Sequence, residues 1–152
     1  LVGSEMCIRD RGTSTAGIAH AAITATILDL PMGYVRSGHK DHGRQNQIEG
    51  KMEPGTKVVV IEDLISTGGS VLEVVDVLRQ AGAQVLGIAS IFTYGLQKGV
   101  ERLAAADVVN YSLSDFDTLS KVAAAEGYIA DKDIAKLTAF QKNPQNPAWM
   151  KL

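Results

Sequence analysis

Apolar positions recur along the chain with two different periods, and these predict helices and strands in turn. Residues 16–28 are rich in alanine and apolar on more than one face, which is typical of a helix packed against a sheet. Residues 32–35 and 57–62 are short, mostly apolar runs that predict buried strands. The first part of the chain is therefore expected to alternate between helix and strand.

A second helix is expected over residues 71–81, because its apolar side chains fall on one face. These side chains are Val71, Val74, Val75 and Leu78, and Gly82 then predicts a left-handed helix end. The remaining expected elements are a strand over 85–92, a helix over 99–106, a strand over 108–111, a helix from a Ser114 cap to about residue 126, and a helix from an Asp131 cap to about residue 142. This alternation predicts an α/β fold with a mostly parallel sheet flanked by helices.

The composition is that of one soluble domain. A chain of 152 residues can bury one core, and a formal net charge of −2, with both signs interspersed, gives no bulk attraction for nucleic acid. The single cysteine, Cys7, cannot build a disulfide framework, so we expect a reducing compartment, the cytoplasm, and give Cys7 no catalytic role. No apolar run approaches the roughly 18 residues of a spanning helix, so no membrane partner is expected.

Three loops follow expected strands, at the edge where open α/β sheets bind their ligands. They cover residues 12–17, 37–56 and 63–70. In the third loop, Gly68, Gly69 and Ser70 lead directly into a helix whose first N–H groups have no partner within the helix, which predicts an anion site. The alternative for this loop is an ordinary helix cap with its acids in solvent.

Two acidic residues, Glu62 and Asp63, stand beside this expected anion site. A carboxylate would repel a phosphate, so the acid pair is expected to face another part of the ligand, either sugar hydroxyls or a magnesium ion. Better-known phosphate motifs do not fit the glycine loops. The spacing of Gly12 and Gly17 resembles a P-loop, but Ile18 follows and the lysine is absent, and neither loop contains a dinucleotide fingerprint.

The second loop is long and polar, which favours a mobile lid. Its cations could close over an anion, although a solvated surface excursion is the alternative. The cationic side chains are Arg36, His39, Lys40, His42, Arg44 and Lys51.

These stretches resemble a known family. VVVIEDLISTGGS, residues 58–70, resembles the PRPP-binding motif of type I phosphoribosyltransferases, and YVRSGHKDHGRQNQIEG, residues 34–50, resembles the catalytic loop of the family members that use orotate. The likeness runs from Gly12 to the end of the chain. It implies a glycosyltransferase that moves the phosphoribosyl group of PRPP to orotate, giving orotidine 5′-monophosphate and pyrophosphate in pyrimidine biosynthesis, with Mg²⁺ carried by PRPP and no metal ligand in the chain.

The resemblance also implies a role for each loop. Glu62 and Asp63 would meet the ribose hydroxyls, Ser66 would touch orotate, and Lys40 would act in catalysis. The residues expected to contact PRPP are Arg36, Lys40, His42, Glu62, Asp63, Leu64, Ile65, Ser66, Thr67, Gly68, Gly69 and Ser70, and those of the pyrophosphate loop are Thr13, Ser14, Thr15, Ala16 and Gly17. In the family the lid reaches the neighbouring subunit of a homodimer.

The beginning of the chain departs from the family. Residues 1–11 match nothing in it, so we expect an unrelated leader followed by a single phosphoribosyltransferase domain over 12–152. Family members carry about a third more chain at the front, which forms a hood over orotate and supplies the first core strand. Both are expected to be missing here.

Other functions on this fold are a phosphoribosyltransferase for a purine base and a non-catalytic PRPP-binding regulator. The Lys40-Asp41-His42-Gly43 sequence of the lid argues against the purine enzyme. A regulator of transcription would need a nucleic-acid surface, for which the interspersed charge gives no support. A structural domain without any ligand would leave three polar strand-end loops unexplained.

Overall fold

The computed structural model describes residues 8–13, 15–36 and 47–151, with side chains described from Gly12 onward. Strands and helices alternate as expected. The elements are β1 (Ile8–Thr13), α1 (Ala16–Leu28), β2 (Met32–Val35), β3 (Ile48–Glu49), β4 (Lys57–Ile65), α2 (Gly69–Gln80), β5 (Gln84–Thr93), α3 (Gln97–Ala105), β6 (Asn110–Asp115), α4 (Phe116–Ala125), α5 (Asp133–Lys142) and the 3-10 helix η2 (Pro147–Lys151).

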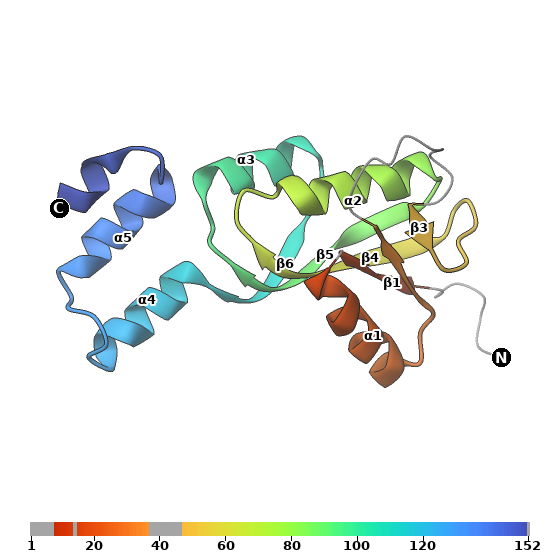
Figure 1. Cartoon of the computed structure of the whole chain (residues 1–152), viewed down its shortest axis with the longest axis horizontal. Helices are drawn as coiled ribbons and strands as arrows, with labels where there is room; N and C mark the ends of the chain where they lie inside the picture. Colours follow the sequence, from red (N-terminus) through yellow and green to blue (C-terminus); the bar gives the residue numbers. More distant parts are fainter. Residues whose placement is uncertain (1–7, 14, 37–46, 152) are drawn as a thin grey trace.

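The strands form one sheet in the order β3-β2-β1-β4-β5-β6. Every neighbouring pair is parallel except β2 and β3, so the predicted α/β fold with a mostly parallel sheet is confirmed. Helices α2 and α3 cover one face of the sheet and α1 lies against the other, while α4, α5 and η2 extend away beyond β6 (Figure 1). No helix among the described residues is long and apolar enough to cross a membrane.

The core lies between the sheet and α2. Val58 and Val60 of β4 alternate toward the helix, which buries Val71, Val74, Val75 and Leu78 against them. The predicted apolar face of this helix is therefore confirmed. Gly82 has a φ of 86°, as the predicted left-handed stop requires.

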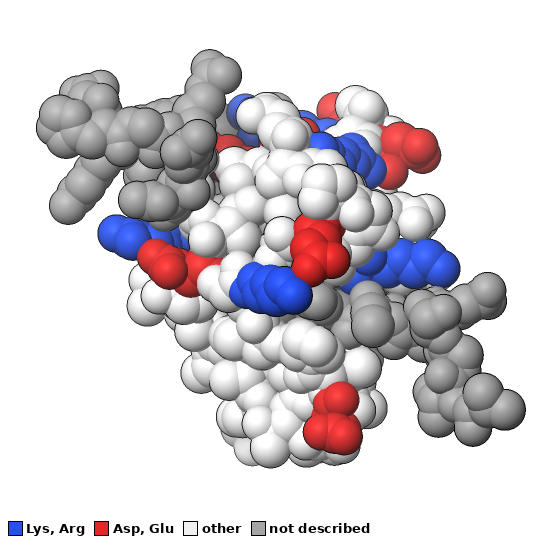
Figure 2. Space-filling model, turned by 90° about the vertical axis from the view of Figure 1, so that its right-hand side faces the viewer, with Lys and Arg blue, Asp and Glu red and all other residues white. Residues whose placement is uncertain are grey.

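Helix α1, unlike α2, exposes large apolar side chains. It contains no Lys, Arg, Asp or Glu, and Figure 2 shows the part of the molecule where it lies as largely uncharged. Ala21 and Ala25 are buried against the sheet, whereas Ile23 and Ile27 are 58% and 76% exposed. Helix α1 therefore packs on the sheet through small residues and leaves large apolar side chains exposed.

The expectation that the first core strand is missing was wrong. Strand β1 lies in the centre of the sheet, where Arg11 pairs with Gly33 of β2 on one side and Val60 of β4 on the other. A ladder joins backbone N–H and C=O groups, which every residue except proline carries, so a polar sequence can complete it. The strand crosses residue 11, and the proposed boundary between leader and domain stays a prediction.

Several predicted boundaries were also wrong. Strand β6 runs to Asp115, four residues beyond the expected end, and Asp115 rather than Ser114 caps α4 by accepting a hydrogen bond from the Thr118 N–H at 2.7 Å. Helix α5 begins at Asp133 without a side-chain cap from Asp131, and the Asp133 carboxylate accepts a hydrogen bond from the Ala130 N–H of the preceding turn at 3.1 Å. Strand β4 continues to Ile65, so the acid pair lies within it.

Candidate functional site

The first and third predicted loops lie side by side at one edge of the sheet. Strands β1 and β4 are parallel neighbours, with Gly12 opposite Ile61, so the loops that leave their carboxyl ends meet. The Thr13 hydroxyl is buried and donates a hydrogen bond to the Ile61 carbonyl at 3.4 Å. The structure therefore brings the predicted pyrophosphate loop next to the acid pair, with Ser14 outside the described residues.

Two glycines make this close approach possible. A Cβ on Gly17 would lie 2.6 Å from the Ile61 carbonyl oxygen, and one on Gly12 would lie 2.6 Å from the Ile18 Cα. A larger residue at either position would push α1 away from the sheet. The P-loop-like glycine spacing therefore has a packing cause, while Thr15 and Ala16 remain exposed at the start of α1.

The third loop joins β4 to α2 through a left-handed residue, Gly68, with a φ of 73°. Helix α2 has no acidic residue in its first turn, and the Leu72 N–H is the first to bond back, to the Gly68 carbonyl at 3.1 Å. The N–H groups of Gly69, Ser70 and Val71 precede it and have no acceptor within the helix. Together with the exposed Ser66 and Ser70 hydroxyls, they form a site for an anion.

Helix α3 packs against this loop and donates a hydrogen bond to it. A Cβ on Gly99 would lie 2.6 Å from the Ser66 carbonyl oxygen, and the Arg102 guanidinium donates to the Thr67 carbonyl at 3.3 Å. Arg102 was not among the predicted site residues. It lies 35 positions from Thr67 in the chain, and no local sequence pattern connects the two.

Side chains of the predicted motif do not all face the site. Ile65 belongs to the core, so any ligand contact it makes must come from its backbone. Leu64 is 42% exposed. The motif therefore combines residues that pack the strand with residues that can reach a ligand.

The acid pair occupies two environments. Glu62 is only 4% exposed, and its burial, reinforced by the Asp63 side chain, raises its pKa to about 7. Its Oε1 accepts the Asp63 N–H at 3.1 Å, whereas its Oε2 is buried without a hydrogen-bond partner among the described residues. Asp63 is half-buried, and the Glu62 side chain lowers its pKa. Glu62 therefore ionises only near pH 7, whereas Asp63 ionises more readily than an ordinary aspartate.

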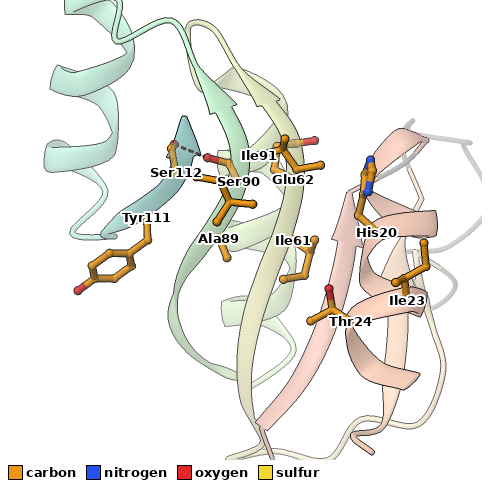
Figure 3. Close-up of a pocket in the computed structure, with 11 residues that line it drawn as sticks. His20, Ile23, Thr24, Ile61, Glu62, Ala89, Ser90, Ile91, Tyr111 and Ser112 are labelled. Carbon is orange, nitrogen blue, oxygen red and sulfur yellow. Dashed lines mark hydrogen bonds between the residues drawn. The ribbon is translucent and has the colours of Figure 1, made fainter. Parts of the chain in front are cut away.

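A cavity of about 410 Å³ opens beside Glu62, between α1 and strands β4 to β6 (Figure 3). His20 and Thr24 of α1 form one wall, and Glu62, Ile91 and Tyr111 lie across from them. His20 was not predicted as a site residue, because an isolated histidine in an apolar helix carries no motif.

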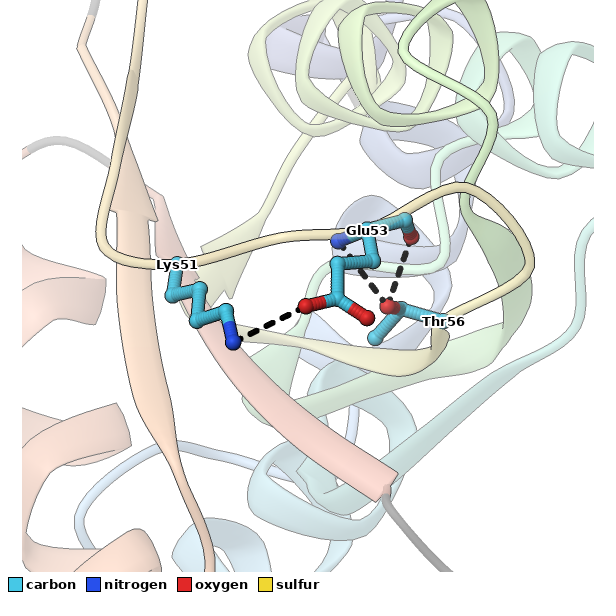
Figure 4. A network of polar contacts seen from close by, with 3 residues as sticks. All are labelled: Lys51, Glu53 and Thr56. Carbon is cyan, nitrogen blue, oxygen red and sulfur yellow. Dashed lines mark hydrogen bonds and ion pairs between the residues drawn. The ribbon is translucent and has the colours of Figure 1, made fainter.

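The base of the second loop is described at both ends. Arg36 follows β2, and its guanidinium forms an ion pair with the Glu49 carboxylate of β3 at 2.7 Å. After β3, Lys51 pairs with Glu53 at 2.9 Å, and the Thr56 hydroxyl accepts the Glu53 N–H and donates to its carbonyl (Figure 4). These contacts lie at the two described ends of the predicted lid.

Lys40 and His42 lie outside the described residues, as do His39 and Arg44. Across residues 8–13, 15–36 and 47–151, no group of three or more His, Cys, Asp and Glu side chains could hold a metal ion.

Comparison with known proteins identifies what this arrangement is similar to. A family model for the phosphoribosyl transferase domain matches residues 7–121. The chain is 60% identical over 139 residues to orotate phosphoribosyltransferase of Bacillus cereus strain B4264, and 59% identical to that of Bacillus mycoides. Both matches cover 91% of this chain and 66% of the relative, so the chain spans just under two thirds of their length.

Solved structures have the same fold. Orotate phosphoribosyltransferase from Aeropyrum pernix matches with a TM-score of 0.69 and 30% identity, over 83% of this chain and 68% of that one. Leishmania donovani UMP synthase matches with a TM-score of 0.74 and 24% identity, over 88% of this chain and 28% of that one. The second similarity concerns the fold alone.

Proposed function

Because the chain belongs to the phosphoribosyltransferase family, we propose that it transfers the phosphoribosyl group of PRPP to orotate, giving orotidine 5′-monophosphate and pyrophosphate. The observation that carries this proposal is the acid pair, which stands between the loop after β1 and the helix start after β4. A ligand that carries a sugar between two phosphate groups matches this order of sites.

The 5′-phosphate is assigned to the start of α2. Its free N–H groups and the hydroxyls of Thr67 and Ser70 can donate to phosphate oxygens, and Gly68 and Gly69 allow the backbone to approach closely. The Arg102 hydrogen bond to Thr67 and the packing of Gly99 stabilise the conformation of this loop in the absence of ligand. A preformed loop loses less conformational entropy on binding.

The ribose hydroxyls are assigned to Glu62 and Asp63. Hydroxyl groups donate hydrogen bonds to carboxylates, and the unpartnered Oε2 of Glu62 offers an acceptor that nothing else in the described structure uses. Burial makes Glu62 reluctant to ionise, so binding of the diol should favour its charged form. The two acids then position the ribose ring for cleavage at its anomeric carbon.

The pyrophosphate is assigned to the loop of residues 13–17 and to the lid. Cleavage leaves positive charge on the ribose and adds negative charge to the departing pyrophosphate, and Lys40 would stabilise the latter together with Arg36 and His42. Mg²⁺ would be carried on the pyrophosphate oxygens of PRPP and would neutralise part of their charge. Lid closure would exclude water and protect the cationic sugar from hydrolysis.

The proposal includes an assembly and a location. A lid that acts in the neighbouring subunit makes the active form a homodimer, and a PRPP-dependent step of pyrimidine synthesis fits the cytoplasm. Orotate, rather than a purine, is supported by the names of the relatives at about 60% identity. Ser66 is the described residue that we assign to orotate.

An assay that follows orotate loss tests this function. Purified chain should consume orotate only when both PRPP and Mg²⁺ are present, and should release one pyrophosphate for each orotate consumed. Adenine or guanine in place of orotate serves as the control for the base. Purine consumption without orotate consumption would contradict the assignment of the base, and PRPP loss without any base would indicate hydrolysis instead of transfer.

A further inference from the structure

The loop between β5 and α3, residues 94–96, contacts the end of β4 next to Ser66. The Tyr94 N–H donates a hydrogen bond to the Ile65 carbonyl at 2.9 Å, and Ile65 immediately precedes Ser66. Gly99 of α3 packs against the carbonyl of Ser66 itself, where an added Cβ would lie 2.6 Å from the oxygen. The backbone on both sides of Ser66 is therefore positioned by the segment that runs from β5 into α3.

Gln141 of α5 binds the same loop. Its side-chain amide donates a hydrogen bond to the Tyr94 carbonyl at 2.9 Å. Gly95, with a φ of 58°, leaves room for this amide, since a Cβ on Gly95 would lie 2.9 Å from the Gln141 Nε2. Tyr94 therefore links α5 to β4, because its carbonyl accepts from Gln141 and its N–H donates to Ile65.

Aromatic rings connect the same two parts of the chain. Five rings form a connected series in which neighbouring centroids lie 5.2 to 6.1 Å apart. In order from β5 to η2 they are Phe92, Tyr94, Phe116, Phe140 and Trp149. Phe140 directly precedes Gln141 on α5, so its ring contacts help to place the Gln141 amide against the loop.

This link reaches one part of the site more than another. Ser66, which we assign to orotate, is the site residue that adjoins the hydrogen bond between Tyr94 and Ile65. The phosphate site begins one residue later and has its own support, because Arg102 donates to the Thr67 carbonyl. Loss of the α5 contact should therefore disturb orotate binding more than PRPP binding.

We propose that Gln141 is a positioning residue, which fixes the loop after β5 and, through it, the Ser66 backbone at the place assigned to orotate. The effect on orotate rests on the proposed function. The link from Gln141 to Ser66 is a property of the free chain. Helix α5 lies beyond residues 7–121, which the family model matches, so a helix outside the matched domain acts on the site.

The first test removes the amide. Gln141→Leu keeps a side chain of similar size but has no donor for the Tyr94 carbonyl. Gln97→Leu is the matched control, because it removes an exposed amide that donates to the Glu101 carboxylate within α3 at 2.8 Å.

The second test breaks the same contact from the loop. Gly95→Ala places a methyl group where the Gln141 amide lies and should displace it from the Tyr94 carbonyl. Its control is Gly127→Ala, which carries a similar backbone cost at a φ of 76° but has nothing within 4 Å of the new Cβ. If Gln141→Leu does not fold by thermal melting, Gly95→Ala decides the outcome.

Amide NMR of the full chain without ligand measures the link. In Gln141→Leu and Gly95→Ala the Tyr94 N–H should exchange with solvent about fivefold faster, and the Ser66 amide signal should move. Both should stay as in the wild type in the two controls.

Steady-state kinetics with orotate and PRPP then measure the consequence. Gln141→Leu and Gly95→Ala should raise the KM for orotate about fivefold, the scale of one lost hydrogen bond, and leave the KM for PRPP within about twofold of the wild type. Arg102→Ala should show the opposite selectivity, because it acts on the Thr67 side of the loop.

The outcomes separate the two proposals. An unmoved Ser66 signal in folded Gln141→Leu would overturn the link between α5 and the site. An equal rise of both KM values would assign Gln141 a general structural role and also overturn the proposal. A wild-type chain that consumes no orotate, with moved Ser66 signals in the variants, would refute the proposed function and leave the link from Gln141 to Ser66 standing.

Discussion

Gly17 lies against the carbonyl of Ile61 so closely that a Cβ on residue 17 would come within 2.6 Å of the oxygen. This contact sets the distance between α1 and β4. It thereby fixes the predicted pyrophosphate loop, the acid pair and His20 relative to one another. Packing and ligand geometry depend on the same glycine.

Gly17→Ala should destabilise the chain by about 2 kcal/mol, because the added methyl group overpacks a backbone contact that cannot move aside easily. Chemical denaturation measures the difference. Gly69→Ala is the matched control, since its new Cβ would meet only the flexible Arg102 side chain at 3.6 Å and should change the free energy of unfolding by less than about 0.5 kcal/mol. Equal stability of Gly17→Ala and the wild type would show that α1 can shift away from β4.

Glu62→Gln should stabilise the chain at pH 8. The folded-state pKa of Glu62, about 7, exceeds its ordinary value of 4.5, so the folded chain binds more protons between these values and loses stability as the pH rises through them. Glutamine does not ionise, so the variant does not lose this stability. We expect its free energy of unfolding to exceed that of the wild type by on the order of 2 kcal/mol at pH 8, and the difference to shrink toward zero near pH 4.5.

Urea denaturation at a series of pH values checks this prediction. Glu73→Gln, which changes an exposed glutamate of α2, should leave the pH dependence of stability as it is in the wild type. A Glu62→Gln curve parallel to that of the wild type from pH 4.5 to 8 would mean that Glu62 titrates in the folded chain as it does in solvent.

Arg102→Ala should weaken PRPP binding about threefold, because the loop after β4 loses a hydrogen bond that holds it in the binding shape. Arg79→Ala is the matched control. Arg79 also donates to carbonyls, those of Ala106 and Asp107, but at the far end of α2. Its loss should lower stability and spare PRPP affinity, and equal binding losses in the two variants would contradict a local role for Arg102.

Lys40→Ala should lower turnover by on the order of 100-fold, the scale of one lost preorganised charge on the departing pyrophosphate. Steady-state kinetics with PRPP and orotate measures this change. Lys51→Ala, at the described end of the same loop, should affect turnover far less. Unchanged turnover in Lys40→Ala would refute its catalytic role.

Features set by local periodicity could be predicted from the sequence. The buried face of α2, with Val75 and Leu78 fully enclosed, follows from the 3.6-residue repeat, and the left-handed Gly82 follows from its place after that repeat. Strand-end loops could likewise be assigned to one edge, because parallel strands end on the same side. Here the expected and observed structures agree.

Features set by contacts between distant segments could not be predicted. Residues 8–11 carry no strand pattern in the sequence, yet their backbone pairs with β2 and β4 in the sheet. Strand β3 has two residues and exists only by pairing with β2. Arg102 and His20 join the site because helices from other parts of the chain bring them there, which no spacing in the sequence reveals.

Titration of PRPP and Mg²⁺ onto the full chain, with Asp63→Asn measured beside the wild type, tests the central claim most directly. The substitution keeps the size of the side chain and removes its negative charge, so the hydrogen bonds that we assign between Asp63 and the ribose diol should weaken. We predict saturable one-to-one binding by the wild type and at least tenfold weaker binding by Asp63→Asn, the scale of a lost charged hydrogen bond. Equal affinities would contradict the assignment of the acid pair to ribose.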